Sequence, residues 1–176
     1  LWETNRGCPF SCTFCDWGSA VQSKVYAFSM DRLVKEIEWF AQKHIQLVFS
    51  CDANFGILKR DLEIAQAMAN MRRHYSYPET FMIQGTKNTT ERAYQIYKTL
   101  SDAHMNPSVA LSLQSLNSEA LKHVKRENIS LATYRELQAR FSQEGVKTYT
   151  DLLIGLPGET YESFVEGINQ LLKEGQ

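Results

Sequence analysis

The segment Ile45-Gln-Leu-Val-Phe-Ser50 decides how this chain folds. It is an apolar run with β-branched and aromatic members, which predicts a buried strand. A polar loop, Cys51–Gly56, follows this strand. The next segment, Asp61–Arg73, has apolar residues at helical spacing and predicts a helix. This strand, loop and helix form a unit that recurs along the chain.

Four more predicted strands alternate with helices. The strands are expected at Leu1–Arg6, Thr80–Gln84, Val109–Gln114 and Val146–Ile154. The helices are expected at 29–43, 88–104, 130–145 and 160–175, with a shorter one at 117–125. Ser29, Ser130 and Thr160 are the expected N-caps, and Asn88 with Glu91 is expected to form a capping box. Such alternation predicts an α/β fold with a parallel sheet. Because a complete eightfold barrel needs about 250 residues, five units predict a partial TIM-like barrel, with a doubly wound open sheet as the alternative.

Composition and charge narrow the class of protein. The 176 residues are 43% hydrophobic, which is enough for one sizeable core in a single domain. The net charge of −1 argues against a strongly basic nucleic-acid surface, and no apolar run approaches membrane-spanning length. With neither an initiator Met nor a signal peptide, the chain is expected to be a fragment of a longer protein. Four cysteines are too few for a disulfide scaffold, so we expect a cytoplasmic protein.

Three of these cysteines lie close together in the pattern Cys8-x3-Cys12-x2-Cys15. Thiolates bind iron–sulfur clusters and zinc well. Three ligands on one compact loop suit a cubane cluster with one iron free of protein ligands. A structural zinc ion would need a fourth ligand, and the first histidine is the distant His44. Zinc, or cysteines with no shared role, remain the alternatives to a cluster.

Several motifs resemble the radical S-adenosylmethionine (radical SAM) superfamily. The cysteine pattern, with the aromatic Phe14 before the last cysteine, is that family's signature. The segment Asp151-Leu-Leu-Ile-Gly-Leu-Pro-Gly-Glu-Thr160 resembles its fifth-strand motif. The segments 111–117 and 121–126 resemble its fourth-strand region. The resemblance extends over essentially the whole chain.

The resemblance implies a fold and a reaction. Cys8, Cys12 and Cys15 would ligate a [4Fe-4S] cluster, and S-adenosylmethionine would chelate the fourth iron. Its reductive cleavage would give a 5'-deoxyadenosyl radical that abstracts hydrogen from a small-molecule or peptide substrate. The electron would come from a protein such as flavodoxin or ferredoxin. The fold would be a partial (β/α)6 barrel, of which residues 1–176 form an incomplete core domain.

The resemblance also implies a cofactor-binding set. Asp52 and Asn54 stand where many members carry a Gly-Gly-Glu motif that binds the methionine amine. Phe14 would lie close to the adenine, Gln114 would contact the ribose and Leu156 would pack on the adenine. Each of these residues has an ordinary alternative, as a turn, loop or core residue. No catalytic residue is identified.

Three cations are further candidates for ligand contacts. Lys125 and Arg126 are candidates for the methionine carboxylate, and Lys87 is a candidate for a contact with substrate or a carboxylate. The alternative for Lys125 and Arg126 is that they complement a helix dipole, and for Lys87 that it is a solvated loop residue.

The departure from Gly-Gly-Glu, together with Cys15-Asp-Trp-Gly18, resembles the cobalamin-binding branch of the superfamily. That branch implies cobalamin on a preceding domain, and methyl transfer or rearrangement as the reaction. The alternatives are a cobalamin-free member, such as a methylthiotransferase or a coproporphyrinogen oxidase-like protein, and a non-catalytic iron–sulfur or zinc protein. No membrane or nucleic-acid partner is expected.

Overall fold

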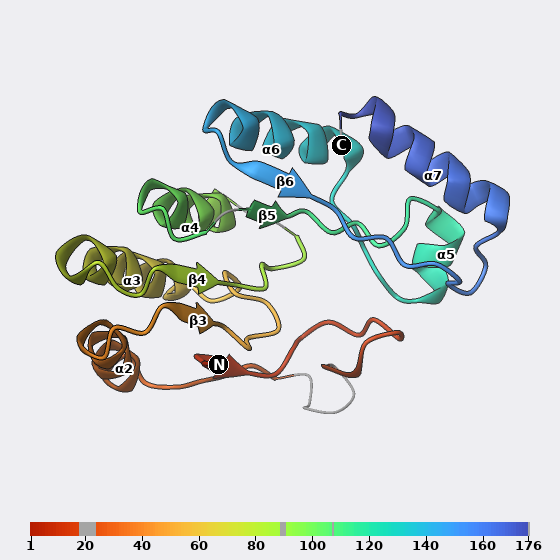
Figure 1. The fold of residues 1–176 in the computed structure, drawn as a ribbon. Coiled ribbons are helices and arrows are strands. Elements are labelled where there is room, and N and C mark those ends of the chain that lie inside the picture. Colours follow the sequence, from red (N-terminus) through yellow and green to blue (C-terminus); the bar gives the residue numbers. More distant parts are fainter. Residues whose placement is uncertain (18–23, 89–90, 107, 176) are drawn as a thin grey trace.

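The structure is a computed structural model that describes residues 1–17, 24–88, 91–106 and 108–175. Strands and helices alternate along it, as the sequence predicts (Figure 1). The strands are β1 (Asn5–Arg6), β2 (Tyr26–Ala27), β3 (Leu47–Phe49), β4 (Thr80–Met82), β5 (Ser108–Ala110) and β6 (Lys147–Tyr149). The helices are α2 (Met30–Gln42), α3 (Asp61–Tyr75), α4 (Glu91–Asp102), α5 (Ser118–His123), α6 (Leu131–Gln143) and α7 (Tyr161–Lys173).

The predicted parallel pairing is confirmed for two pairs of strands, and the hydrogen-bonded sheets that they form are small. β3 pairs with β4 and β5 pairs with β6, both in parallel, whereas the unpredicted β2 pairs antiparallel with β1. Beyond these pairs, single parallel bridges join Trp2 to Ser50, Phe55 to Gly85 and Gln114 to Leu152. Among the described residues the strands therefore form three small sheets rather than a closed barrel.

The strands are shorter than predicted, and two of them, β4 and β5, end before the predicted carboxyl ends at Gln84 and Gln114. Gln114, the last residue of one predicted strand, has a φ of 68°, in the left-handed region. Gly85 follows the predicted strand Thr80–Gln84 and takes part only in an isolated bridge. These strand ends carry polar side chains and glycine, which do not continue the apolar pattern that identifies the strand.

Side-chain caps set the starts of the helices. Ser29 Oγ accepts from Arg32 N at 3.4 Å, Ser130 Oγ from Thr133 N at 3.1 Å and Thr160 Oγ1 from Ser163 N at 3.2 Å. These bonds satisfy N–H groups that the first turn of a helix leaves free. These three predicted N-caps are confirmed, whereas the fourth, Asn88, precedes residues 89–90, which lie outside the described part of the chain. No helix in the described part of the chain combines the length and the apolar character needed to cross a membrane.

Two main apolar clusters support the strands. The first lies under α2, α3, β3 and β4, and its fully buried members include Leu33, Ile64, Met68 and Phe81. The second lies between β5, β6 and α6, and includes Val109, Tyr134 and Phe141. In Figure 1 the arrowheads of β3, β4 and β6 point toward the side where residues 7–17 and α5 lie. The polar loops therefore meet at the carboxyl ends of the strands.

Candidate iron–sulfur and cofactor site

The three clustered cysteines lie on the segment that leads from β1 toward β2, whose described residues 7–17 form the cysteine loop. All three thiols are free, with Cys8 and Cys12 buried and Cys15 half-buried. A turn is closed by Cys15 N donating to Cys12 O at 3.1 Å. Thr13 N donates to Val124 O, also at 3.1 Å, and so attaches the middle of the loop to the end of α5. The backbone of this loop is thus fixed by contacts at more than one point.

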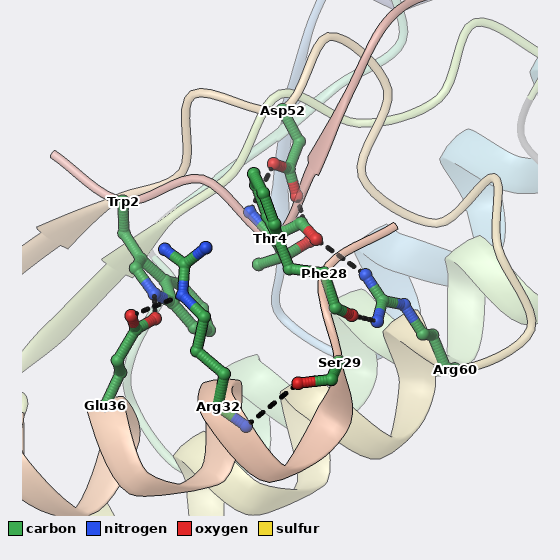
Figure 2. Close-up of polar contacts among 8 residues, drawn as sticks. All are labelled: Trp2, Thr4, Phe28, Ser29, Arg32, Glu36, Asp52 and Arg60. Carbon is green, nitrogen blue, oxygen red and sulfur yellow. Dashed lines mark hydrogen bonds and ion pairs between the residues drawn. The ribbon is translucent and has the colours of Figure 1, made fainter. Parts of the chain in front are cut away.

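The base of the cysteine loop is closed by a polar network (Figure 2). Thr4 N donates to Asp52 Oδ1 at 2.7 Å, and the Thr4 hydroxyl donates to the other carboxylate oxygen. Thr4 O in turn accepts from Phe28 N at 3.0 Å and from Arg60 Nη2 at 2.6 Å, while Arg60 Nη1 donates to Phe28 O. Because Thr4 precedes the loop and Phe28 follows it, these bonds hold its two ends together.

Glycine is required at the neck of the same loop. Gly7 has a φ of +108°, and a Cβ added there would lie 2.0 Å from Lys24 O. A side chain would therefore collide with backbone rather than with a movable group. This close approach lets the chain enter and leave the cysteine loop through a narrow opening.

A second set of contacts fixes the start of the chain on α2 (Figure 2). Trp2 Nε1 donates to Glu36 Oε2 at 2.7 Å, and Arg32 Nε donates to Glu36 Oε1 at 2.7 Å. The Arg32 guanidinium also lies 4.2 Å from the centre of the Phe28 ring. These contacts stabilise the segment that carries Thr4, and with it the base of the cysteine loop.

A cavity of about 140 Å³ opens between this loop and the strand ends. Two of the three cysteines, Cys8 and Cys15, line it. Asn54 from the loop after β3 and Gln114 from the segment after β5 also line it. Polar side chains from separate strand ends and two thiols therefore surround one cavity. The carboxyl ends of the strands, where this cavity lies, are the usual position of a ligand site in parallel α/β proteins.

Nitrogen donors point at the sulfur atoms. Asn54 Nδ2 donates to Cys8 Sγ at 3.2 Å, and Lys87 Nζ donates to Cys12 Sγ at 2.6 Å. Burial lowers the pKa of the Arg126 guanidinium, and the nearby thiols of Cys12 and Cys15 oppose this change. Such donors stabilise negative charge on sulfur, which is the form that binds metal.

This donor set fits a [4Fe-4S] cluster better than a single zinc ion. Zn–S bonds of about 2.3 Å in a tetrahedron place neighbouring sulfurs roughly 3.8 Å apart. In the ranges that the structure describes, no three His, Cys, Asp or Glu side chains come close enough to hold one metal ion. In a cluster each cysteine binds its own iron, so wider spacing is needed. The three free thiols, two of which accept from nitrogen donors, are the groups that would ligate such a cluster.

The structure brings together only part of the cofactor-binding set that the resemblance implies. Asn54 and Gln114 line the cavity beside Cys8 and Cys15. Asp52 is buried, and its two oxygens accept from Thr4 and Asn5 instead. Phe14 lies on a turn and is 39% exposed, and Leu156 is buried in a small cluster with Ala120 and Val124. Neither Phe14 nor Leu156 lines the cavity that Asn54 and Gln114 share.

Two residues near the site were missed by the sequence analysis. Arg60 closes the base of the cysteine loop, yet in the sequence it resembles any charge before a helix. Asp61 is fully buried, and its Oδ2 accepts from Gly56 N at 2.8 Å and Leu58 N at 2.9 Å. Burial raises the pKa of Asp61 to about 6. Its position at the start of α3 was a possible signal, because an acidic residue there often caps the preceding loop.

Comparison with known proteins shows the family of the chain. The family model of the radical SAM superfamily matches residues 2–171. The chain therefore belongs to the radical SAM superfamily.

Two curated relatives are each 49% identical to this chain over 175 residues, which is 99% of it. One is the 2-(S-pantetheinyl)-carbapenam-3-carboxylate methyltransferase of Streptantibioticus cattleyicolor, and the other is the cobalamin-dependent radical SAM methyltransferase TokK of Streptomyces tokunonensis. Each match covers 26% of the relative, so the chain spans about a quarter of their length.

The fold is also found in a solved structure. The methyltransferase TsrM from Kitasatospora setae, in a structure with a tryptophan substrate and a SAM analogue, has a TM-score of 0.81 at 16% identity. The match covers 98% of this chain and 33% of that protein. At this identity the likeness supports the radical SAM fold alone.

Proposed function

We propose that this chain is the catalytic core of a cobalamin-dependent radical SAM methyltransferase that acts on a small molecule. The observation that carries the proposal is the loop of three free thiols, two of them beside nitrogen donors, at the carboxyl ends of parallel strands. The family match identifies the chemistry available to such a loop. The two relatives at 49% identity favour the methyltransferase branch over a methylthiotransferase or an oxidase.

In this proposal Cys8, Cys12 and Cys15 hold a [4Fe-4S] cluster. When bound, the cluster supplies an electron that cleaves S-adenosylmethionine to methionine and a 5'-deoxyadenosyl radical. The contribution of the chain is to keep the three thiols apart on a loop fixed at its base, its neck and its turn. Asn54 donates to Cys8 Sγ and so orients the first ligand.

The polar lining of the cavity supports binding of S-adenosylmethionine there. Asn54 and Gln114 present amide groups that can hydrogen-bond to an amine or a hydroxyl. The predicted role of Asp52 at the methionine amine remains a proposal, and its bonds to Thr4 and Asn5 support a second role in fixing β1. Phe14 and Leu156 as adenine contacts also remain proposals, since both lie outside the cavity lining.

We further propose that residues 1–176 form the core of a partial (β/α)6 barrel. The alternation of β3, β4, β5 and β6 with helices supports this architecture, as does the likeness to TsrM. The electron donor is proposed to be a flavodoxin or ferredoxin. Cobalamin would be bound by a part of the protein outside this chain.

The proposed branch is tested by following the methyl group of S-adenosylmethionine in the full-length protein. The protein is reconstituted with iron and sulfide without oxygen, reduced, and assayed with and without added cobalamin. The proposal predicts release of S-adenosylhomocysteine only when cobalamin is present, because transfer of the methyl group leaves that product. Formation of 5'-deoxyadenosine with no cobalamin-dependent S-adenosylhomocysteine would place the protein in a cobalamin-free branch.

A further inference from the structure

Two cations flank the second cysteine of the loop. Lys87, from the segment after β4, places Nζ 2.6 Å from Cys12 Sγ. The same ammonium lies 4.2 Å from the centre of the Phe10 ring, and Lys87 N donates to Asn54 Oδ1 at 3.4 Å. The lysine ammonium therefore contacts the cysteine loop at Cys12 and Phe10, and the Lys87 backbone is bound to Asn54.

Arg126 approaches the same cysteine from the segment after α5. Its side chain is only 7% exposed, with Nε donating to Asn128 Oδ1 at 2.8 Å and Nη2 to Ser112 O at 2.5 Å. Asn128 is fixed in turn, because its Nδ2 donates to Leu113 O at 2.6 Å and to Ser115 O at 3.0 Å. This buried guanidinium is thus oriented by backbone that belongs to the strand-end region.

Neither cation has a carboxylate partner in the part of the chain that the structure describes. A buried charge normally has a counter-ion, because removing it from water is costly. The negatively polarised groups of the cysteine loop that face them are sulfur atoms: Cys12 Sγ faces Lys87 Nζ, and the thiols of Cys12 and Cys15 lie near the Arg126 guanidinium, which also donates to Ser112 O and Asn128 Oδ1. Arg126 and Lys87 line both the cavity that includes Cys8 and Cys15 and an open groove of about 650 Å³ that includes Cys12. Each of the three cysteines therefore shares a cavity or groove with the two cations.

The two cations, Lys87 and Arg126, would stabilise negative charge on the cysteines and on the cluster that they hold. A [4Fe-4S] cluster together with its three thiolate ligands gains one negative charge on one-electron reduction. A nearby cation therefore favours the reduced form. The reduction potentials of protein-bound clusters are set by net charge, hydrogen bonds to sulfur and solvent exposure. Burial of Arg126 makes its effect stronger, because the field of a buried charge is poorly screened.

On the basis of the proposed function, we propose that Lys87 and Arg126 are a charge pair that raises the reduction potential of the cluster held by Cys8, Cys12 and Cys15. This assignment differs from the sequence-based candidates, which were the methionine carboxylate for Arg126 and the substrate or a carboxylate for Lys87. The two assignments predict effects on different measurements. A charge pair acts on the cluster when no S-adenosylmethionine is present, whereas a carboxylate ligand acts only on the affinity for that molecule.

The test is a redox titration of the reconstituted full-length protein, without S-adenosylmethionine, followed by electron paramagnetic resonance of the reduced cluster. Lys87→Gln and Arg126→Gln should each shift the one-electron equilibrium at least about tenfold toward the oxidised form, which corresponds to about 59 mV. The charge-keeping variants Lys87→Arg and Arg126→Lys should stay within about threefold of wild type. Iron content and dissociation constants for S-adenosylmethionine are measured on the same samples.

Lys122 provides a matched control for overall charge. It lies on α5 and lines the same open groove, but it is exposed and its side chain has no contact with sulfur among the described residues. Lys122→Gln removes the same charge and should move the equilibrium by less than about twofold, because solvent and salt screen an exposed group.

Three results would overturn the inference. The potential of Lys87→Gln could equal that of wild type, Lys122→Gln could shift the potential as much as Lys87→Gln, or the variants could change only the affinity for S-adenosylmethionine. Because Lys87 is only half-buried, its variant keeps the test decisive even if Arg126→Gln does not fold. A wild-type protein that binds no cluster would contradict the proposed function as well. A wild-type protein that binds the cluster, with a reduction potential that the variants do not change, would contradict this inference alone.

Discussion

Asp52 Oδ1 accepts a hydrogen bond of 2.7 Å from the backbone N–H of Thr4, a residue 48 positions earlier in the chain. The same oxygen accepts from Asn5 N at 3.1 Å, and the other oxygen accepts from the Thr4 hydroxyl. These bonds join the loop after β3 to the strand that leads into the cysteine loop. The position of the cysteines therefore depends on a carboxylate that is not expected to bind the cluster.

Replacement of Asp52 should reduce stability. Asp52→Ala leaves two buried N–H groups and one hydroxyl without their acceptor, and we expect the free energy of unfolding to fall by about 3 kcal/mol. Asp52→Asn keeps the shape and loses the charge, so the loss should be roughly half as large. Urea denaturation measures both. Asp151→Ala is the control, because Asp151 is exposed and accepts from Ser112 Oγ alone among the hydrogen bonds described for its side chain.

The same variants distinguish the two roles of Asp52. If Asp52 also binds the methionine amine, Asp52→Asn weakens binding of S-adenosylmethionine by more than its loss of stability accounts for. An unchanged dissociation constant, in a protein that has lost stability, would leave Asp52 with the structural role alone. A denaturation midpoint equal to that of wild type for Asp52→Ala would contradict the structural role.

The buried carboxylate of Asp61 should make stability depend on pH. Burial raises its pKa from an ordinary 3.8 to about 6 in the folded chain, so between these values the folded chain binds the proton more tightly than the unfolded chain does. The contribution of Asp61 to stability is therefore greatest below about pH 4. It should fall by about 3 kcal/mol as the pH rises through 6.

Asp61→Asn removes this titration and keeps an oxygen that accepts from Gly56 N and Leu58 N. The measurement is the free energy of unfolding of both proteins in urea from pH 4 to pH 7. The difference between wild type and Asp61→Asn should change across this range, with wild type losing relative stability as the pH rises. Parallel curves would show that Asp61 titrates normally.

Gly85, which lines the cavity, is fitted closely against Tyr97. A Cβ added at Gly85 would lie 2.1 Å from the Tyr97 hydroxyl oxygen. We expect Gly85→Ala to cost about 1–3 kcal/mol of stability through this overlap. Tyr97→Phe removes the oxygen, so the double variant should recover much of the loss. A double-mutant cycle measures the coupling, and strictly additive effects would contradict the contact.

The sequence predicts features that depend on neighbouring residues. Ser29, Ser130 and Thr160 cap helices through bonds to residues three positions later, so their pattern is visible locally. The cysteine spacing is local in the same sense. Asn54 follows one predicted strand and Gln114 ends another, and parallel strands place such residues at one edge. These parts of the fold and site needed no knowledge of tertiary contacts.

Other features depend on contacts between distant segments and could not be predicted in this way. Asp52 has the residue type and position of an amine ligand, and only the approach of Thr4 shows its other partners. Lys87 and Cys12 are 75 positions apart in the chain. The strand β2, Tyr26–Ala27, is too short to show an alternating pattern and forms only because β1 lies beside it. Packing, rather than local propensity, decides each of these contacts.

The most direct test of the account is cleavage of S-adenosylmethionine by the reconstituted full-length protein under reducing, oxygen-free conditions. Wild type should bind about four irons at the cysteine loop and release 5'-deoxyadenosine. Cys8→Ala, Cys12→Ala and Cys15→Ala should each abolish that product. Cys51→Ala should retain it, since Cys51 is a free thiol outside the motif. Undiminished 5'-deoxyadenosine in any of the three motif variants, or a wild-type protein that holds stoichiometric zinc and leaves S-adenosylmethionine intact, would contradict the account.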